Sequence, residues 1–398
     1  MDMNIRPVLA VLAFVAGTAV FGHGDGLSES SDFVRPVPDI GIVDTSTASA
    51  LGDMKTFEWQ NHFDRLYGES AMRYHFATRQ PRKFASWQKH FRAELKDILG
   101  LTLLERRLAT FKPTARLVER EELDFGVRER WIVWTEPDVP LPCVILRPRN
   151  LNGKVPLVIT PHGHSLNTEL YAGVYLSPTD TALVRDGERD IAVQAVREGY
   201  IAIAPAARGF GPTRHPQELG NNAICSCRTL LMNDMLVGRT PIGDRVWDIM
   251  KIIDYALENL PVDGRNIIVT GQSGGGTATI FAGAVEPRIT ISAPACAFCT
   301  MSGSIGTIIH CECNYVPGIM ELGEMSDVAG LTAPRCFYPI CGQRDEIFPI
   351  GEARKAFAEV KQIYQRAGAD GNCEMYEGEG GHRYYKAGVW KFVKDHLK

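Results

Sequence analysis

A serine in a glycine-rich turn is the first residue whose surroundings point to chemistry. Residues 271–275 read Gly-Gln-Ser-Gly-Gly, the G-x-S-x-G pattern, with Ser273 at its centre. An apolar run at 267–270 precedes the pattern and a small-residue segment follows it, so we expect a sharp strand-to-helix turn that exposes the serine hydroxyl. We interpret Ser273 as a nucleophile. The alternative is a tight glycine turn whose serine caps the following helix.

A serine hydroxyl needs a base to attack at neutral pH, and the base needs a carboxylate to orient it. Downstream of Ser273 the only histidines are His310, His382 and His396. His382 follows a predicted strand and the glycine-rich residues 378–381, whereas His310 lies among cysteines and His396 lies in the last helix. The sequence therefore predicts His382 as the base. The alternative is an exposed loop histidine.

The orienting carboxylate is expected shortly after the predicted strand at 336–340. Asp345 follows this strand by a short loop, and the carboxyl ends of parallel strands are where open α/β sheets collect their functional residues. Glu346 is the neighbouring rival, and a surface pair between Arg344 and Asp345 is the non-catalytic alternative. We predict Asp345, because the shorter side chain is the commoner orienting group.

The tetrahedral intermediate of acyl transfer also needs hydrogen-bond donors for its oxyanion. The backbone N–H of Gly274, directly after the nucleophile, is one candidate. The loop at 161–164 reads Pro-His-Gly-His, and the N–H of His164 is the second candidate. His162 and His164 could instead ligate a metal, but no acidic or thiol ligand lies close in sequence, so we expect no metal site here.

Strand and helix patterns alternate along most of the chain, which predicts an α/β protein with a mostly parallel central sheet and helices on both faces. Thr240 before a proline is a good helix start, because the threonine can cap the first turn. The predicted strands lie at 157–160, 201–204, 267–270, 336–340 and 373–376, and the predicted helices at 190–198, 240–257 and 352–365.

The N-terminal third of the chain is expected to differ from the rest. Arg6 followed by an apolar stretch at 8–21 is typical of a signal peptide, here residues 1–22, and predicts a secreted or periplasmic protein. An uncleaved N-terminal anchor is the alternative. Residues 23–115 are predicted as a partly helical extension, and residues 116–398 as the catalytic domain.

Ten cysteines fit an exported protein better than a cytosolic one. Six of them occur in close pairs, Cys225/Cys227, Cys296/Cys299 and Cys311/Cys313. A zinc site is one interpretation, since Cys-x-x-Cys and a neighbouring histidine resemble metal ligands. We favour disulfide bonds that link long surface insertions, because a second Cys-x-x-Cys at finger spacing is absent from the sequence.

Two connections, 209–240 and 294–334, are too long for simple strand-to-helix loops. Both leave the predicted sheet beside the candidate site, so we expect them to form the walls of a substrate pocket. They contain four side chains suited to binding sugar hydroxyls or a uronate: Arg228, Glu312, Asn314 and Tyr315. The same groups could instead satisfy each other within a folded lid.

The charge distribution gives no reason to expect a nucleic-acid partner. The chain has 43 basic and 47 acidic residues, a formal net charge of −4, and no long run of either sign. Nothing in this distribution indicates a nucleic-acid partner.

The candidate residues together resemble bacterial α/β-hydrolases of the dienelactone hydrolase and acetylxylan esterase type, over about residues 120–398. The motifs that carry the resemblance are His162-Gly163, Arg208-Gly209-x-Gly211, Gly271-x-Ser273-x-Gly275, Asp345 and His382. Cephalosporin-deacetylase-like members have a tyrosine, a glutamine and Arg-Gly-Gln where this chain has His164, Gly274 and Arg208-Gly209-Phe210. Dienelactone hydrolases have a cysteine nucleophile where this chain has Ser273.

The resemblance implies an α/β-hydrolase fold, a Ser273, Asp345 and His382 triad, and an oxyanion site at Gly274 and His164. Together with the export signal and the cysteine-rich insertions, it predicts a secreted carbohydrate esterase, similar to acetylxylan esterases and some pectin methylesterases, that removes acetyl or methyl esters from a polysaccharide. Such a triad needs no cofactor. The alternatives are a serine peptidase of the prolyl-oligopeptidase type, or a non-catalytic binding protein with this fold.

Overall fold

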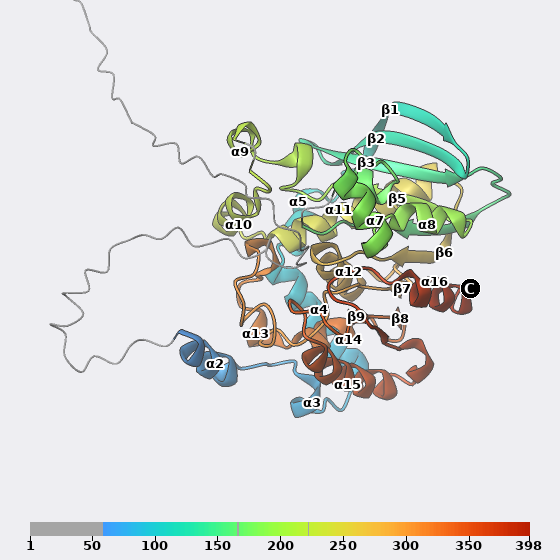
Figure 1. Ribbon diagram of the computed structural model, residues 1–398. Coiled ribbons are helices and arrows are strands. Elements are labelled where there is room, and N and C mark those ends of the chain that lie inside the picture. Colours follow the sequence, from blue (N-terminus) through green and yellow to red (C-terminus); the bar gives the residue numbers. More distant parts are fainter. Residues whose placement is uncertain (1–58, 165–166, 222) are drawn as a thin grey trace, which may run out of the picture. The chain divides into compact units, whose positions relative to one another are not determined.

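The computed structural model describes residues 59–164, 167–221 and 223–398, so the predicted signal peptide at 1–22 lies outside the described residues. An eight-stranded sheet forms the centre (Figure 1), in the order β1-β2-β3-β5-β4-β6-β7-β8. Antiparallel pairs join β1, β2, β3 and β5, and parallel pairs join β5, β4, β6, β7 and β8. The strands are β1 (Thr114–Leu123), β2 (Gly126–Glu136), β3 (Val139–Pro148), β4 (Val155–Ile159), β5 (Ile201–Pro205), β6 (Val262–Val269), β7 (Ile291–Ser292) and β8 (Cys336–Phe337).

Helices separate the strands and line both faces of the sheet (Figure 1). The longer helices are α2 (Trp59–Glu69), α4 (Phe84–Ile98), α7 (Pro178–Gly187), α10 (Cys227–Leu236), α11 (Pro241–Asn259), α12 (Gly274–Val285), α15 (Ile350–Arg366) and α16 (Lys386–Asp395). The shorter ones are α3 (Phe76–Arg79), α5 (Leu101–Arg107), α6 (Thr168–Tyr171), α8 (Ile191–Arg197), α9 (Pro216–Gly220), α13 (Ile319–Leu322) and α14 (Met325–Gly330), with 3₁₀ turns η2 (Gly211–Thr213), η3 (Glu312–Asn314) and η4 (Asp370–Asn372).

The buried strands supply side chains alternately to two hydrophobic cores, because successive residues of a strand point to opposite faces. On β4, Leu157 and Ile159 join the core that contains α4, α11, α12, α14 and α15, whereas Val158 joins the core of α6, α8 and α16. Both faces of the sheet are thus covered, which explains why its central strands are apolar throughout. The predicted fold class, an α/β-hydrolase sheet with helices on both faces, is confirmed.

Helix α11 begins where the sequence predicts. Thr240 is its N-cap, and the Thr240 hydroxyl accepts a hydrogen bond of 3.0 Å from the N–H of Gly243. Pro241 occupies the first helical position, where a missing N–H costs no intrahelical hydrogen bond. The predicted helices at 190–198 and 352–365 correspond to α8 and α15.

The prediction of one continuous strand at 336–340 is wrong. The segment forms β8 and a separate strand, β9 (Ile340–Gly342), which pairs in parallel with β10 (Tyr376–Gly378). Pro339 lies at the break and has no N–H to donate to a neighbouring strand. The N–H groups on either side continue the ladder, since Tyr338 donates to Ser292 O at 2.9 Å and Ile340 donates to Pro294 O at 2.8 Å.

The described part of the N-terminal segment is helical and packs on the sheet core. Trp87, Phe91 and Leu95, one face of α4, are buried in the same core as α11 and α12. The domain boundary placed at residue 116 stays a prediction. Within the described residues, none of the helices has both the length and the apolar composition that crossing a membrane would require.

Candidate functional site

Ser273 lies in the turn between β6 and α12. Its backbone has φ 57° and ψ −125°, a positive φ that non-glycine residues rarely adopt. Such a conformation costs about 1–3 kcal/mol and persists only where the surrounding structure holds it. Here the Ser273 N–H donates to Ala295 O at 2.8 Å. This is the geometry expected of a nucleophile at a sharp strand-to-helix turn.

Glycines allow the loop after β4 to lie directly on this turn. A Cβ atom at Gly275 would lie 2.0 Å from Pro161 O, which excludes any side chain there. A Cβ atom at Gly163 would lie 2.9 Å from Ser273 Cβ. The predicted loop at 161–164 therefore contacts the serine turn through backbone atoms.

His382 and Asp345 form a hydrogen-bonded pair. His382 Nδ1 lies 2.8 Å from Asp345 Oδ2, and Asp345 Oδ1 accepts from the N–H groups of Ile347 at 2.9 Å and Phe348 at 3.0 Å. Burial alone would raise the pKa of Asp345, but His382 and these hydrogen bonds outweigh burial and lower it. The carboxylate is therefore ionised near neutral pH, so His382 Nδ1 is the donor of the pair.

The loop that carries His382 is held next to the serine turn. Gln272 Nε2, from the residue before Ser273, donates to His382 O at 3.1 Å, and Arg189 Nη2 donates to the same oxygen at 3.3 Å. The ring of Phe348 stacks on the His382 imidazole with 6.0 Å between ring centroids. These contacts bring the histidine loop and the serine turn together.

Glu346, the alternative orienting carboxylate, lies at the surface. Glu346 is exposed, whereas Asp345 is only 4% exposed and bonds to His382. The structure thus brings the segments of the three predicted residues to one place, in the expected chain order. The catalytic roles of Ser273, His382 and Asp345 stay predictions.

The two residues predicted for the oxyanion are neighbours. A Cβ atom at Gly274 would lie 2.9 Å from His164 Cε1, so the His164 ring packs against the first residue of α12. The first N–H groups of a helix have no intrahelical partner and point outward from its start. Gly274 and the His164 ring therefore lie together beside Ser273, and the role of their N–H groups as donors to an oxyanion stays a prediction.

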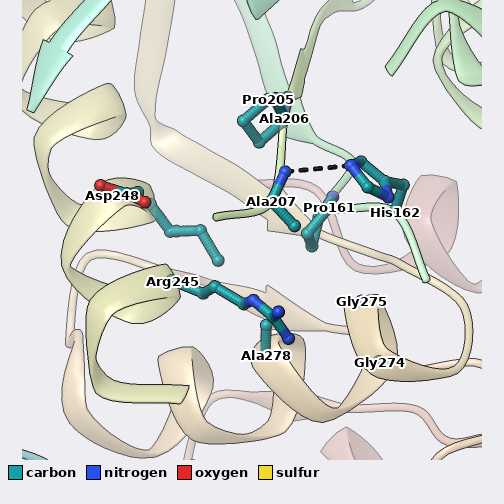
Figure 2. A pocket seen from close by; sticks show the side chains of 11 residues that line it. Pro161, His162, Pro205, Ala206, Ala207, Arg245, Asp248, Gly274, Gly275 and Ala278 are labelled. Carbon is teal, nitrogen blue, oxygen red and sulfur yellow. Dashed lines mark hydrogen bonds between the residues drawn. The ribbon is translucent and has the colours of Figure 1, made fainter. Parts of the chain in front are cut away.

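His162 holds the loops after β4 and β5 together. The N–H of Ala207 donates to His162 Nε2 at 2.9 Å, so the proton of the ring is on Nδ1, which donates to Gly163 O at 2.9 Å (Figure 2). Burial lowers the pKa of His162 to about 4, so the ring is neutral at pH 7. Both nitrogens are occupied, which excludes His162 as a metal ligand in this conformation.

A small pocket is lined by the loops after β4 and β5, by helix α11 and by the start of α12. Figure 2 shows His162 on one side of it and Arg245 on the other, close to the start of α12. Its wall is otherwise formed mainly by prolines, alanines and glycines: Pro161, Pro205, Ala206, Ala207, Gly274, Gly275 and Ala278.

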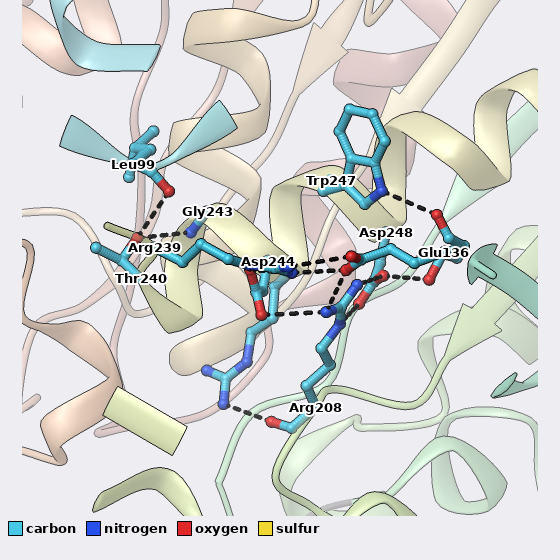
Figure 3. A network of polar contacts seen from close by, with 11 residues as sticks. Leu99, Glu136, Arg208, Arg239, Thr240, Gly243, Asp244, Trp247 and Asp248 are labelled. Carbon is cyan, nitrogen blue, oxygen red and sulfur yellow. Dashed lines mark hydrogen bonds and ion pairs between the residues drawn. The ribbon is translucent and has the colours of Figure 1, made fainter. Parts of the chain in front are cut away.

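Arg208, part of the family-like motif, points into a buried network of charges (Figure 3). Its guanidinium pairs with Glu136 at 2.7 Å, Asp244 at 3.1 Å and Asp248 at 2.6 Å, and Arg239 pairs with Glu136 and Asp244. Burial opposes the charge on Arg208, but the three carboxylates raise its pKa well above the usual value. The network joins β2, the loop after β5 and helix α11, and so stabilises the packing of these three elements against one another.

The residues predicted to bind substrate have different surroundings. Arg228 is exposed on α10, and Glu312 is half-buried, with its carboxylate accepting from Cys311 Sγ at 3.7 Å. Asn314 is buried and its Nδ2 donates to His310 Nδ1 at 2.9 Å, while the hydroxyl of Tyr315 donates to Ile305 O at 3.0 Å. Asn314 and Tyr315 thus have partners inside their own insertion.

The disulfide bonds favoured from the sequence are not found among the described residues, which include all ten cysteines. The reason is that three of them, from two insertions, meet around a histidine instead of pairing off. Cys227, Cys311, Cys313 and His164 place one ligand atom each within 4.8 Å of the others. No thiol lies close to His164 in sequence, but the fold brings these three cysteines to it from distant segments.

His310 lies beside the site, although the sequence favours His382 over it as the catalytic base. Its ring packs edge-on against Phe348, the residue that stacks on His382, at 5.4 Å between centroids. Burial lowers the pKa of His310 to about 4, and its Nε2 has no hydrogen-bond partner among the described residues. The sequence signal that could have identified His310 is its position in an insertion that we expect to line the substrate pocket.

Comparisons with known proteins agree with this architecture. A protein of Bacillus subtilis (strain 168), YtaP, named as a hydrolase, is 23% identical over 294 residues, 73% of this chain and 92% of its own. The crystal structure of a Bacteroides fragilis protein, named as an acetyl xylan esterase, aligns with a TM-score of 0.66 and 18% identity over 82% of this chain and 83% of its own. The methylesterase BT1017 aligns with a TM-score of 0.59 and 19% identity over 79% of this chain and 64% of its own.

At these identities the solved structures establish the fold. The family assignment comes from the sequence itself, since residues 62–300 match the Abhydrolase family. This match spans more than half of the chain and includes Ser273, His164 and both partners of the His162 hydrogen bonds. The chain therefore belongs to the Abhydrolase family of hydrolytic enzymes.

Proposed function

We propose that this protein is a secreted serine esterase that removes acetyl or methyl esters from a polysaccharide or its oligomers. The observation that carries the proposal is the 2.8 Å pair between His382 and Asp345, held beside the strained turn of Ser273. The names of the similar structures, an acetyl xylan esterase and a methylesterase, support the ester and glycan parts of the proposal.

In the proposed reaction, Ser273 Oγ attacks the ester carbonyl while His382 Nε2 takes its proton. The N–H groups of Gly274 and His164 donate to the oxyanion of the tetrahedral intermediate. His382 returns the proton to the leaving alcohol, which departs as the carbonyl of the acyl-enzyme forms. A water molecule, deprotonated by His382, then releases the acid and restores the Ser273 hydroxyl.

The charge of Asp345 stabilises the protonated form of His382 in the proposed reaction. Asp345 is ionised, because His382 and the N–H groups of Ile347 and Phe348 lower its pKa despite burial. Its negative charge, 2.8 Å from Nδ1, favours the imidazolium that forms when Ser273 attacks. The exposed Arg228 is the foremost proposed contact to the glycan, since Glu312, Asn314 and Tyr315 each have a hydrogen-bond partner within their own insertion.

The proposed export rests on the sequence. Arg6 and the apolar residues 8–21 have the order of charge and hydrophobicity that a signal peptide needs. Expression with these residues should place the protein outside the cytoplasm and yield an N-terminus near residue 23, which Edman sequencing or mass spectrometry of the exported protein would reveal.

The enzymatic part is tested by measuring acetate release from acetylated xylan and methanol release from methyl-esterified pectin. The wild-type protein should release one of them, and Ser273→Ala should lose several orders of magnitude in turnover. A fluorophosphonate probe should label the wild type and not Ser273→Ala. Hydrolysis of peptides or of long-chain p-nitrophenyl esters, without release from any glycan, would contradict the proposal, as would equal labelling of both proteins.

A further inference from the structure

A cluster of soft metal ligands lies next to the candidate site and has no role in the proposed chemistry. Cys227 comes from the insertion at 209–240, Cys311 and Cys313 come from the insertion at 294–334, and His164 comes from the loop after β4. One ligand atom of each lies within 4.8 Å of the others. Cys227, Cys313 and His164 are buried, and Cys311 is partly buried.

We propose that His164, Cys227, Cys311 and Cys313 bind a structural zinc ion. Three thiolates and one imidazole form one of the usual tetrahedral ligand sets of structural zinc sites. Cys311 Sγ lies 3.5 Å from Cys313 Sγ, and His164 Nε2 lies 3.1 Å from Cys313 Sγ. Ligands bound to one zinc ion at about 2.0–2.3 Å lie at comparable separations, whereas a disulfide would bring its sulfurs to about 2.05 Å.

A buried cation next to the cluster balances its charge. Zinc with three thiolates and a neutral histidine carries one net negative charge, which is costly to bury alone. Arg245 is buried, and its Nη2 donates to Cys227 Sγ at 3.7 Å and to Arg208 O at 2.9 Å. Its guanidinium also lies over the ring of Phe210, which packs edge-on against His164. Such outer partners orient the ligands of a metal site.

The ligand number indicates a structural ion and not a catalytic one. Catalytic zinc sites keep a position for water or substrate, whereas four protein ligands close the coordination sphere. Cys225 lies in the same small buried cluster and its thiol contacts those of Cys227 and Cys311, but it is not among the four residues whose ligand atoms all lie within 4.8 Å of one another. We therefore assign Cys225 to the surroundings of the ion.

The ion would join three segments that are far apart in sequence. It would tie both insertions to the loop after β4 through His164, whose ring packs against Gly274. The position of the His164 N–H beside the oxyanion would then depend on the metal. This last consequence rests on the proposed function, whereas metal binding itself does not.

The experiment measures metal content and thiol chemistry in the full chain, produced in zinc-supplemented medium. Elemental analysis should find about one zinc per chain in the wild type. Cys227→Ser, Cys313→Ser and His164→Ala should each lose most of it, whereas Cys336→Ser, a buried cysteine outside the cluster, should keep it. Cobalt exchanged into the wild type should give the visible and sulfur-to-metal absorption bands of a tetrahedral thiolate site.

The wild-type measurements test whether the protein binds zinc even if a variant fails to fold. Wild-type protein without bound metal, whether its clustered cysteines are linked by disulfides in mass spectra or react as free thiols, would overturn the proposal. Zinc that survives in His164→Ala but is lost in Cys225→Ser would overturn the assignment of His164 as a ligand. Because these measurements do not use hydrolysis, a failed esterase assay would leave the metal result unaffected.

Discussion

At the scale of residues, the two oxygens of Asp345 have different partners, and this difference fixes the histidine tautomer. Oδ1 accepts from two backbone N–H groups, and Oδ2 faces His382 Nδ1. An ionised carboxylate only accepts hydrogen bonds, so Nδ1 must carry the proton and Nε2 is the basic nitrogen. A general base at Ser273 requires this arrangement.

We predict that Asp345→Asn will lower kcat by about 10³–10⁴-fold while leaving the fold intact. The amide oxygen should take the place of Oδ1, because the N–H groups of Ile347 and Phe348 need an acceptor. The amide NH₂ would then face His382 and donate to Nδ1, which moves the ring proton to Nε2. Steady-state kinetics on a short-chain p-nitrophenyl ester and circular dichroism would check both parts.

Glu346→Gln is the matched control, since Glu346 is the exposed neighbour of Asp345. It should change kcat only slightly, because no charge next to His382 is lost. If Glu346→Gln were the damaging substitution and Asp345→Asn the mild one, the orienting carboxylate would be Glu346.

His162 carries a prediction about pH. Burial lowers its pKa from 6.5 to about 4, a shift that corresponds to roughly 3 kcal/mol. Above pH 6.5 the ring is neutral in both the folded and the unfolded chain. As the pH falls from 6.5 to about 4, the unfolded chain takes up a proton that the folded protein does not, so this contribution to stability is lost.

We therefore expect the free energy of unfolding to fall more steeply between pH 6.5 and pH 4 in the wild type than in His162→Gln. The variant should be less stable at pH 7, because the N–H of Ala207 loses its acceptor. Urea denaturation at a series of pH values measures both effects. Parallel pH curves for the two proteins would contradict a depressed pKa of His162. His396→Gln, at the C-terminus, serves as the control for a general loss of histidine.

At the scale of elements, local signals predicted the parts of the site that follow strands. The G-x-S-x-G turn, the Thr240 cap and the loop position of His382 all depend on neighbours in sequence, and such patterns can be recognised from the chain alone. The sequence predicts too long a strand at 336–340, because Pro339 interrupts a run of residues that otherwise favour a strand.

Other parts of the site depend on contacts between distant segments. Cys227 and Cys313 are 86 positions apart and meet only because two insertions fold over the loop of His164. Arg208 was recognised as part of a motif, but its partners Glu136 and Asp248 come from β2 and α11. No periodicity or spacing in a single sequence indicates such contacts, so the sequence alone favours disulfide bonds over a shared ligand cluster.

At the scale of the whole molecule, the N-terminal helices contribute to the core beneath the sheet. Phe91 is fully buried on α4 together with residues of α11 and α12, and Arg92 donates to Ala284 O at 2.7 Å and to Leu331 O at 2.7 Å. The family match begins at residue 62, within α2. These contacts favour a single cooperative unit that includes residues from before the predicted catalytic domain.

We predict that Phe91→Ala will destabilise the whole protein by about 3–5 kcal/mol, because it leaves a cavity in a core shared by α4 and the sheet. Urea unfolding followed by tryptophan fluorescence and by circular dichroism should show one transition, moved to lower urea with both probes. Trp59→Ala, at a side chain 64% exposed on α2, is the control and should change the free energy of unfolding by no more than about 0.5 kcal/mol. The contradicting outcome is two separate transitions, of which Phe91→Ala moves only the minor one. The N-terminal helices would then fold as an independent extension, because loss of their packing would leave the free energy of unfolding of the sheet unchanged.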